Sequence, residues 1–568
     1  MIDNANEVPR GTELSADVCI VGGGAAGIAL AMSLMDRDLS VLVLESGSWQ
    51  HDPRLQSLYD GEVADPALHC PPDKYRERRF GGTTVSWGGR TMPYDPIDFE
   101  RRSFVPGSGW PIGYDDLLPF YPRANALLEA GRFAYDADEV FDPPAPPLIE
   151  GFVSDRVRTN GLERFSCPTN FAARYGKRLR GATNVRVILG ASCTGIHLRP
   201  DRRTVRALGV ATLEGNRFTV TPRSSVVLAV GGLETVRLLL ASRDVVPEGI
   251  GNRHDLVGRH YMCHIAGSVG ALTVNGPTSR VRHGYEISPD GIYCRRRLAL
   301  TEDEQRRLGV MNLVARLHFS RISDPAHRNG VLSGLYLARP FISYEYGKRL
   351  DDGSRPTAGT YLRHLGNVVR HPWDCTAFLG HWIAKRTLAE RKFPSVILRN
   401  RTNRFSLEVH AEQQPLAASR VTLADAVDAL GMPRLRVDWR YSSADIESIR
   451  RTLDVFAEEF ARTGVARFEY DPATLEQELL RFGAYGGHHT GTARMGTDER
   501  TSVVDPDCKV HGVDNLFVAS SAVFPTTSQA NPTLTIVAIA LRLAQHVAAR
   551  AAPRAAEVAT PILSRATT

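Results

Sequence analysis

The sequence contains no C-x-x-C pair, although eight cysteines are spread over its 568 residues. Zinc ribbons, iron–sulfur clusters and c-type haem sites depend on such pairs, so none of them is indicated. Cys19 lies within an apolar run and is expected to be a buried free thiol. His254, His260 and His264 are close in sequence, but their spacing matches no zinc site. We therefore expect no metal, and a structural role for these histidines.

A large excess of charge of one sign is also missing. Lys and Arg number 69 and Asp and Glu 63, which gives a net charge of +6. For a chain of this length, a surplus of this size is too small to indicate a nucleic-acid partner. The short basic clusters at 76–79 and 295–297 are interpreted as solvated surface. No nucleic acid is therefore expected as a partner.

Long uninterrupted apolar runs are absent as well. The stretches 260–279 and 515–541 lack Asp, Glu, Lys and Arg, but Gly, Pro, Ser, Thr and Asn interrupt both of them. Neither is predicted to span a membrane. Residues 1–7 have neither the basic start nor the apolar run of a targeting signal, so a cytoplasmic location is expected. With 43% hydrophobic and 23% charged residues, the chain has the composition of a soluble globular protein, and its length predicts roughly two to four domains.

The strongest local signal lies near the start of the chain. An apolar strand is predicted at 17–21, a helical stretch at 28–34 and a second strand at 40–44. Gly22, Gly24 and Gly27 fit the G-x-G-x-x-G spacing, and Glu45 follows the second strand. Such a βαβ unit binds a dinucleotide: the helix N-terminus faces the pyrophosphate and the acid accepts hydrogen bonds from the ribose. The motif alone does not distinguish FAD from NAD.

Further pieces of an α/β domain are scattered along the chain. Strands are predicted at 185–189, 224–232 and 515–519, and helices at 234–241 and 534–548. Between them, residues 266–480 alternate apolar and polar residues, as at 420–423 and 434–439, with a long helix predicted at 444–463. This pattern is typical of a largely antiparallel sheet with helices on one side.

Several separate motifs then follow in an order known from one enzyme family. They are the N-terminal glycine fingerprint with Glu45 and the segments 79–89, 251–259, 488–496 and 528–534. On these motifs the chain resembles the glucose–methanol–choline (GMC) oxidoreductases, FAD enzymes that oxidise alcohols. Within the family its motifs are most similar to the pyranose-oxidase branch and the bacterial enzymes that oxidise sugars and glycosides.

The resemblance implies the fold and the division of the chain. We expect an α/β flavin-binding domain, Rossmann-like and discontinuous, together with an α+β substrate domain that has a largely antiparallel sheet. The expected FAD-binding domain comprises residues 1–125, 181–265 and 482–553. The expected substrate-binding domain comprises 126–180 and 266–481, and 554–568 is expected to be a flexible tail.

The resemblance also implies which residues hold FAD. They are Gly22, Gly24, Ala25, Ala26, Gly27, Glu45, Ser46, Gly82, Thr83, Ser86, Trp87, Cys193, Ser520, Ser521, Asn531, Pro532 and Thr533. Two of these positions depart from the family pattern. Ser86 stands where relatives often carry a histidine that can bond covalently to the flavin, so FAD is expected to be bound non-covalently. Ser520 stands where many relatives carry an acid.

Alcohol oxidation needs a base, because a proton leaves the hydroxyl as a hydride leaves the carbon. A neutral imidazole can take that proton and FAD can accept the hydride. By resemblance His488 is the base, and Asn531 hydrogen-bonds the same hydroxyl. His489 is the competitor, since side chains that are adjacent in a strand point to opposite sides and one of the two is expected to face the flavin. The motif favours His488.

The expected substrate is a sugar, a glycoside or a similar polyol. The strand-like segment 408–414 has alternate polar residues, which line either a sugar pocket or a solvated sheet face. The expected electron acceptor is oxygen or an external carrier. Three alternatives stay open: a flavin-containing lyase on the same scaffold, a dehydrogenase of a non-sugar alcohol, and a catalytically silent flavin-binding protein. The sequence does not indicate an oligomeric state.

Overall fold

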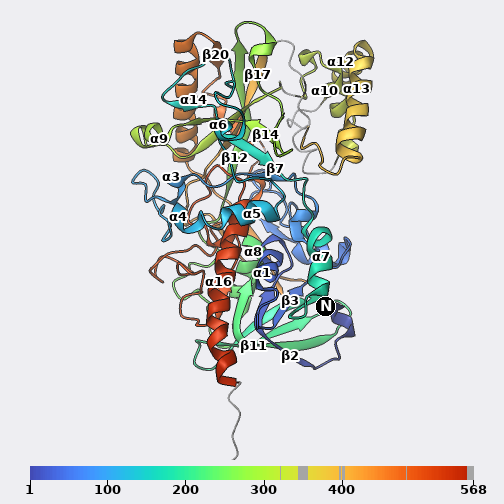
Figure 1. The fold of residues 1–568 in the computed structure, drawn as a ribbon, viewed down its shortest axis with the longest axis vertical. Coiled ribbons are helices and arrows are strands. Elements are labelled where there is room, and N and C mark those ends of the chain that lie inside the picture. Colours follow the sequence, from blue (N-terminus) through green and yellow to red (C-terminus); the bar gives the residue numbers. More distant parts are fainter. Residues whose placement is uncertain (320–321, 343–355, 396–397, 399–402, 482, 559–568) are drawn as a thin grey trace, which may run out of the picture.

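A computed structural model describes residues 1–319, 322–342, 356–395, 398, 403–481 and 483–558. The molecule is elongated, with one large sheet and its helices in the lower half of Figure 1 and a second large sheet in the upper half. Helices α10 (Gly330–Leu337), α12 (Ala358–Arg370) and α13 (Pro372–Trp382) lie to one side of the upper half.

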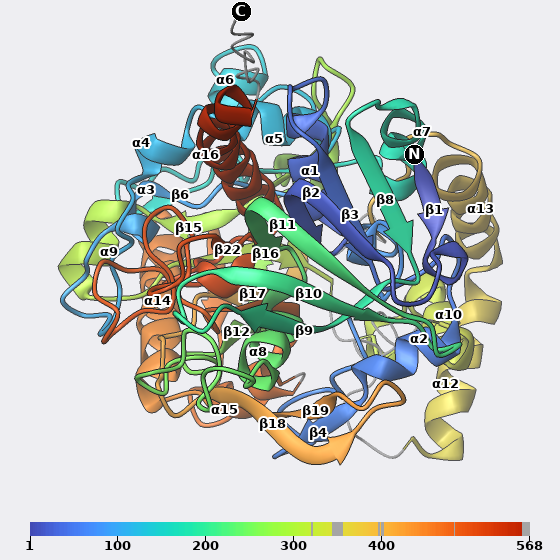
Figure 2. The same cartoon turned by 90° about the horizontal axis from the view of Figure 1, so that it is seen from below.

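The first large sheet has eight strands taken from three distant parts of the chain. Its order is β1-β8-β3-β2-β11-β10-β9, with β22 beside β11. The strands are β1 (Ile2–Asn4), β8 (Val185–Leu189), β3 (Val41–Glu45), β2 (Glu13–Val21), β11 (Arg217–Leu228), β10 (Val205–Ala211), β9 (Ser192–Leu198) and β22 (Leu516–Val518). The pairs from β1 to β11, and β11 with β22, are parallel, whereas β10 pairs antiparallel with both β11 and β9. Figure 2 shows the row of strands from β1 to β11.

Helices pack on this sheet. Helix α1 (Ala25–Leu34) and the C-terminal helix α16 (Thr533–Val558) pack against each other, while α7 (Phe171–Gly181) packs near β8. All five residues of β3 are buried. Within α16, Thr533–Ala551 is long and apolar enough to cross a membrane, but 67% of it is buried inside the protein, as in a core helix.

The second large sheet has the order β20-β12-β17-β16-β15-β6, with β21 beside β12, and all of its pairings among the described residues are antiparallel. Its strands are β20 (Ala466–Glu469), β12 (Met262–Val274), β17 (Arg404–Ala411), β16 (Leu313–His318), β15 (Leu298–Leu300), β6 (Val157–Arg158) and β21 (Tyr485–Thr490). Helix α14 (Ser443–Thr463) packs on β20. A capping box between Ser442 and Asp445 begins this helix, and Gly464 ends it in the left-handed conformation.

Two sequence predictions need correction here. The strands predicted at 420–423 and 434–439 exist as β18 (Arg420–Val427) and β19 (Pro433–Asp438), but they do not join the second large sheet. They form a hairpin that pairs with β4 (Gly61–Val63) from the other end of the chain. The predicted tail at 554–568 begins inside α16, which runs to Val558, and residues 559–568 lie outside the described residues.

Candidate active site

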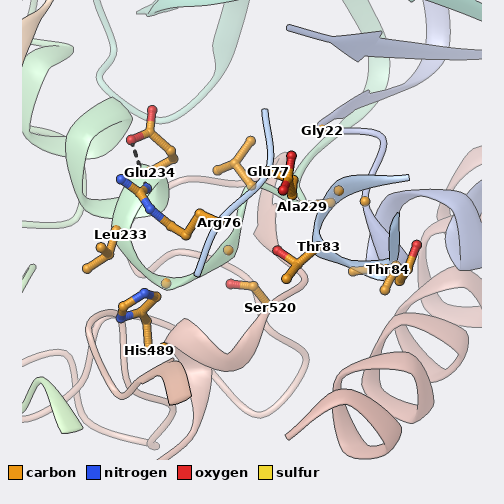
Figure 3. Close-up of a pocket in the computed structure, with 18 of the residues that line it drawn as sticks. Gly22, Arg76, Glu77, Thr83, Thr84, Ala229, Leu233, Glu234, His489 and Ser520 are labelled. Carbon is orange, nitrogen blue, oxygen red and sulfur yellow. Dashed lines mark hydrogen bonds and ion pairs between the residues drawn. The ribbon is translucent and has the colours of Figure 1, made fainter. Parts of the chain in front are cut away.

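A cavity of about 420 Å³ follows the carboxyl ends of β2, β3 and β11 and reaches β21. Figure 3 shows that its walls come from both ends of the chain, with Gly22 and Thr83 facing Ser520 and His489. The carboxyl edge of a parallel sheet is where ligands bind in open α/β folds. Segments that are distant in sequence therefore form one continuous site.

The glycine-rich turn after β2 has the shape that the motif predicts. Gly22 has a φ of 104°, and a Cβ atom there would lie 2.5 Å from the carbonyl oxygen of Ala229. A Cβ at Gly24 would meet nothing closer than 3.8 Å, which leaves room for a ligand beside the backbone. Gly27 does not line the cavity, which corrects its prediction as a cofactor contact. A Cβ there would lie 1.9 Å from the Gly22 carbonyl oxygen, so this glycine allows α1 to pack on the turn.

Glu45 is fixed at the end of β3. Its carboxylate accepts hydrogen bonds from the backbone amides of Gly23, at 2.7 Å, and Gly47, at 2.5 Å. Burial raises the pKa of Glu45, and the two amide hydrogen bonds oppose that rise. The carboxylate thus joins the glycine turn to the segment after β3 while it lines the cavity.

Three helices begin at the cavity. Ala25 at the start of α1, Gly231 at the start of α8 (Gly231–Ala241) and Thr533 at the start of α16 all line it. The unpaired amides of a helix N-terminus carry partial positive charge and favour an anion. Their convergence suits a cofactor with negative charge, such as a pyrophosphate.

Five buried polar atoms on the cavity wall have no hydrogen-bond partner among the described residues. They are Arg78 Nε, Ser86 Oγ, Ser192 Oγ, His489 Nε2 and Asn531 Oδ1. Buried polar groups in folded proteins are nearly always paired, so this wall is complete only with a polar ligand. The open glycine turn, the three helix N-termini and these donors and acceptors fit FAD.

The structure brings the other predicted cofactor residues together. The residues that line the cavity are Gly22, Gly24, Ala25, Ala26, Glu45, Ser46, Gly82, Thr83, Ser86, Trp87, Cys193, Ser520, Ser521, Asn531, Pro532 and Thr533. Both His488 and His489 line it too, although we expected one of them to face away. Their rings belong to separate hydrogen-bond networks.

His488 on β21 lies between two partners. The amide nitrogen of Asn531 donates to its Nε2 at 3.1 Å, and its Nδ1 lies 2.8 Å from Nδ1 of His264 on β12. The ring of His410 on β17 packs on His264, with centroids 4.2 Å apart. Burial lowers the pKa of His264 to about 4 and the pKa of His410 well below its usual range. These buried rings are therefore neutral near pH 7.

This arrangement corrects the expectation for His264, because its ring contacts the predicted base. It also places His410, from the segment 408–414, in a buried position near the site instead of on a solvated face. His264, His410 and His488 lie close enough to hold a metal ion. However, Nδ1 of His264 and Nδ1 of His488 are 2.8 Å apart, which is the distance of a hydrogen bond between them.

His489 belongs to a second network on the other side of the strand. Its Nδ1 lies 2.6 Å from the hydroxyl of Tyr261, which in turn lies 2.8 Å from Nε2 of His69. His69, Cys263 and His489 could also hold a metal ion, but the Tyr261 hydroxyl lies between the two histidines. Sequence reasoning did not indicate His69 or Tyr261, since neither belongs to a motif.

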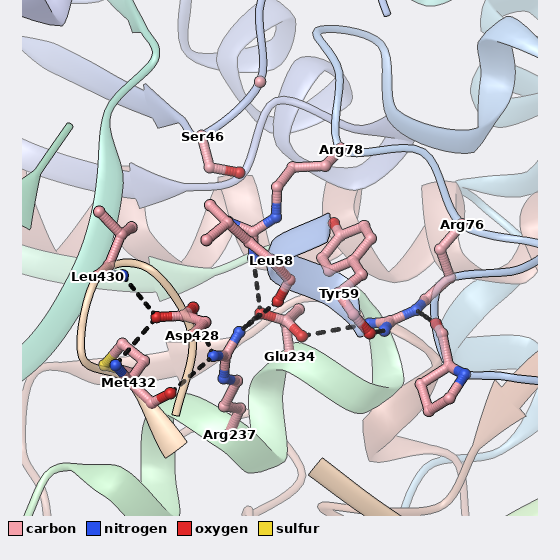
Figure 4. A network of polar contacts seen from close by, with 12 residues as sticks. Ser46, Leu58, Tyr59, Arg76, Arg78, Glu234, Arg237, Asp428, Leu430 and Met432 are labelled. Carbon is pink, nitrogen blue, oxygen red and sulfur yellow. Dashed lines mark hydrogen bonds and ion pairs between the residues drawn. The ribbon is translucent and has the colours of Figure 1, made fainter. Parts of the chain in front are cut away.

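A network of charges lies beside the cavity at the Ser46 end (Figure 4). Glu234 on α8 contacts Arg76 at 3.2 Å, Arg78 at 2.9 Å and Arg237 at 3.5 Å, and Arg237 also contacts Asp428 at 2.6 Å. Burial would raise the pKa of Glu234, but the three arginines hold it below its usual value. The network joins α8 to the turn between β18 and β19.

The basic clusters interpreted as solvated surface are therefore in part buried and paired. Arg76 and Arg78 contact Glu234, which lies more than 150 residues away. Arg295, Arg296 and Arg297 are buried as well and contact Glu408, Glu286 and Asp95. Apart from Glu286, the carboxylates that neutralise them are distant in sequence, so a local charge count could not reveal them.

Comparison with known proteins agrees with this geometry. The sequence profile described as GMC oxidoreductase matches residues 415–540, a range that includes His488 and Asn531. The chain is 25% identical to 2-methyl-1,2-propanediol dehydrogenase of Mycolicibacterium austroafricanum over 94% of its own length and 95% of that protein. It is 40% identical to C-glycoside 3-oxidase of Microbacterium trichothecenolyticum over 23% of its length and 25% of that protein.

A solved structure has the same fold. Pyridoxine 4-oxidase from Mesorbium loti superposes with a TM-score of 0.55 at 19% identity, and the match covers 93% of this chain and 98% of that one. The order of the motifs, the family profile and the fold agree with one another. Residues 415–540 match the GMC oxidoreductase family, and the chain is an FAD-dependent oxidoreductase that acts on CH–OH groups.

Proposed function

We propose that the protein oxidises a hydroxyl group of a sugar, a glycoside or a similar polyol to a carbonyl. His488 is the base and Asn531 its positioning partner. The observation that carries this proposal is the 3.1 Å contact between Asn531 Nδ2 and His488 Nε2 on the cavity wall. When bound, FAD supplies the hydride acceptor.

The proton chemistry follows from the hydrogen bonds of His488. Because the Asn531 amide donates to Nε2, that atom carries a lone pair, and Nδ1 of neutral His488 carries the proton. Nδ1 then donates to Nδ1 of His264, which orients the ring. Nε2 has one lone pair, so the Asn531 amide turns from Nε2 to the hydroxyl when substrate binds, and the hydroxyl proton can then move to Nε2. General-base assistance of this kind is typically worth about 10²–10⁴ in rate.

Other residues of the cavity would hold the cofactor. The glycine turn at Gly22 and Gly24 and the N-terminus of α1 would hold the pyrophosphate, and Glu45 would accept from the ribose. Ser86 has no imidazole to bond the flavin, so FAD is held non-covalently. Because the cofactor residues lie mainly around the first large sheet, we assign the FAD-binding domain to that sheet and the substrate-binding domain to the second.

The substrate class rests on two aromatic residues of the cavity wall and on similarity. Phe165 and Tyr285 line the cavity with ring centroids 5.2 Å apart, and aromatic faces of this kind pack on sugar rings. A glycoside is also the substrate class in the name of the C-glycoside 3-oxidase relative. The second candidate is a dehydrogenase of a small non-sugar diol, which the name of the full-length relative favours.

Anaerobic mixing with a panel of pyranoses, glycosides and small diols tests the proposal. Loss of the oxidised flavin absorbance with a sugar or glycoside, and formation of the matching carbonyl, is the expected result. Bleaching by diols alone supports the second candidate, cleavage products without bleaching indicate a lyase, and no change with any compound indicates a silent flavin-binding protein. Repeating the positive case in air distinguishes oxygen from an external carrier as the acceptor.

Acid precipitation tests the mode of FAD binding. Because Ser86 replaces the histidine that can bond to flavin in relatives, the yellow cofactor is expected in the supernatant. Colour that stays with the precipitated protein would contradict non-covalent binding.

A further inference from the structure

We propose that His489 is a second functional imidazole of the site, held by a buried hydrogen-bond chain in the tautomer that presents a lone pair on Nε2 to the bound cofactor or substrate. The proposal goes beyond the role of His488, and it does not depend on which alcohol is oxidised.

The first observation is that a buried ring nitrogen of His489 lacks a hydrogen-bond partner among the described residues. The side chain of His489 is buried, and its Nε2 has no hydrogen-bond partner among the described residues. Figure 3 shows the ring at the cavity, near Leu233 and Ser520. A buried polar atom is costly to leave unpaired, so a ligand is expected to pair with it.

The hydrogen-bond chain behind the His489 ring starts at the backbone carbonyl group of Cys70. Nδ1 of His69 lies 2.6 Å from the carbonyl oxygen of Cys70, and a carbonyl oxygen only accepts. Nδ1 of His69 therefore carries a proton. The His69 side chain is buried, and burial disfavours a charged ring, so the ring is neutral and its Nε2 is an acceptor. The hydroxyl of Tyr261, 2.8 Å away, donates its single proton to that Nε2.

The same reasoning continues to His489. Having donated its proton to His69, the Tyr261 oxygen can only accept at its second short contact, the one with Nδ1 of His489 at 2.6 Å. Nδ1 of His489 is thus the protonated nitrogen, and Nε2 of the neutral ring carries the lone pair. The Cys263 thiol, 3.2 Å from the Tyr261 oxygen, can donate to it without changing this order.

The neutral state of His489 follows from what surrounds it. Burial is the largest influence that lowers its pKa, and the positive charge of Arg76 adds to the effect, with His69 and His488 contributing further. The ring is therefore neutral near pH 7. It cannot donate from Nε2, and it selects an N–H or O–H group on its ligand.

The backbone around His489 fixes the position of the ring. Its carbonyl oxygen accepts from Ser521 Oγ at 2.7 Å, and a Cβ atom at Gly232 would lie 2.4 Å from the same oxygen. The strand is thus packed tightly against α8 and the start of η9 (Ser521–Val523). Two adjacent histidines then differ in function: Asn531 donates to His488 Nε2, whereas no described residue donates to His489 Nε2.

Histidine ¹⁵N NMR of the apoprotein tests the tautomer directly. We expect the His489 signals to show a protonated Nδ1 and an unprotonated Nε2 in the unsubstituted protein, and a mixture of tautomers in Tyr261→Phe. Tyr175→Phe is the matched control, because it also removes a buried tyrosine hydrogen bond, at 2.6 Å to Leu127, but lies on α7 away from the cavity. A protonated Nε2 in the unsubstituted apoprotein overturns the proposal, whether or not the variants fold.

Binding measurements identify the donor. His489→Leu is compared with His489→Gln, which keeps an acceptor on a side chain of similar length. If FAD is the donor, the Leu variant binds FAD roughly 2- to 10-fold more weakly, its flavin potential shifts, and the Gln variant regains part of the loss. If the substrate is the donor, KM rises by a similar factor while FAD affinity stays constant. The proposal is overturned if FAD affinity, flavin potential and KM all match those of Tyr175→Phe. FAD affinity and flavin potential can be measured without the proposed alcohol oxidation.

Discussion

The Nε2 atom of His488 lies 3.1 Å from the amide nitrogen of Asn531, although 43 residues separate the two in sequence. The first residue belongs to β21, beside the second large sheet, and the second lies in the turn that leads into α16, beside the first. Their contact joins the two halves of the molecule at the cavity. A base on one half and a positioning amide on the other can act on one hydroxyl group.

Replacing these two residues should separate their roles. We expect His488→Ala to keep FAD but to slow flavin reduction by substrate roughly 10²-fold or more, because the proton acceptor is lost. Asn531→Ala should be slower than the unsubstituted enzyme by a smaller factor, since the base remains. Combined, the losses should be less than additive because both groups act on one hydroxyl.

Anaerobic stopped-flow absorbance measures these rates. His254→Ala is the control, since His254 is exposed and does not line the cavity. Reduction of the flavin in His488→Ala at the rate of this control would place the base elsewhere.

Glu45 should contribute to FAD retention. Glu45→Ala removes the carboxylate that would accept from the ribose and leaves the amides of Gly23 and Gly47 without their acceptor. A hydrogen bond to a charged group is worth about 1.5–3 kcal/mol, so FAD affinity should fall roughly 10-fold or more. Fluorescence titration of the apoprotein with FAD measures the change, with the exposed Glu62→Ala on β4 as control. Equal affinities in the two variants would show that this carboxylate does not contact the cofactor.

Local sequence patterns predicted those parts of the site that are formed by one continuous segment of the chain. The turn at Gly22 and the acid at Glu45 belong to a βαβ unit of about thirty residues, so their geometry follows from short-range rules. The contact of His264 with His488 could not be predicted in this way, because 224 residues separate them and β12 must first pair with β21. The burial of Arg78 was missed for the same reason, since Glu234 neutralises it from a distant helix.

Sheet membership shows the same limit. The alternation in β18 and β19 correctly predicted two strands, but alternation records which face is buried and not which strand is the neighbour. The partner, β4, comes from residues near the start of the chain. Predicting it would have required knowledge of how the two halves pack.

Acid should destabilise the protein through its buried histidines. Burial lowers the pKa of His264 to about 4, whereas in the unfolded chain a histidine titrates near about 6.5. Between these values the unfolded chain binds a proton that the folded chain excludes, so the free energy of unfolding falls as pH decreases from about 6.5 towards 4. One such group contributes at most about 1.4 kcal/mol per pH unit.

Thermal unfolding of the holoenzyme between pH 7 and pH 4.5 measures this effect. His264→Gln removes the titrating ring, so the slope of Tm against pH should be smaller than in the unsubstituted enzyme. The exposed His254→Gln should leave the slope unchanged. Identical slopes in all three proteins would mean that His264 is protonated as easily in the folded chain as in the unfolded chain.

The buried pair Arg102–Glu412 should be important for stability. The guanidinium donates to both carboxylate oxygens, at 2.8 and 2.5 Å, and both side chains are at most 1% exposed. Arg102→Met leaves a buried carboxylate unpaired, which should lower the free energy of unfolding by about 3–5 kcal/mol. Adding Glu412→Gln removes that charge and should restore part of the loss. Arg467→Met is the control, because Arg467 and Glu469 form an exposed pair worth about 1 kcal/mol or less. Denaturant titration compares the variants, and equal midpoints for Arg102→Met and Arg467→Met would contradict a stabilising role for the buried pair.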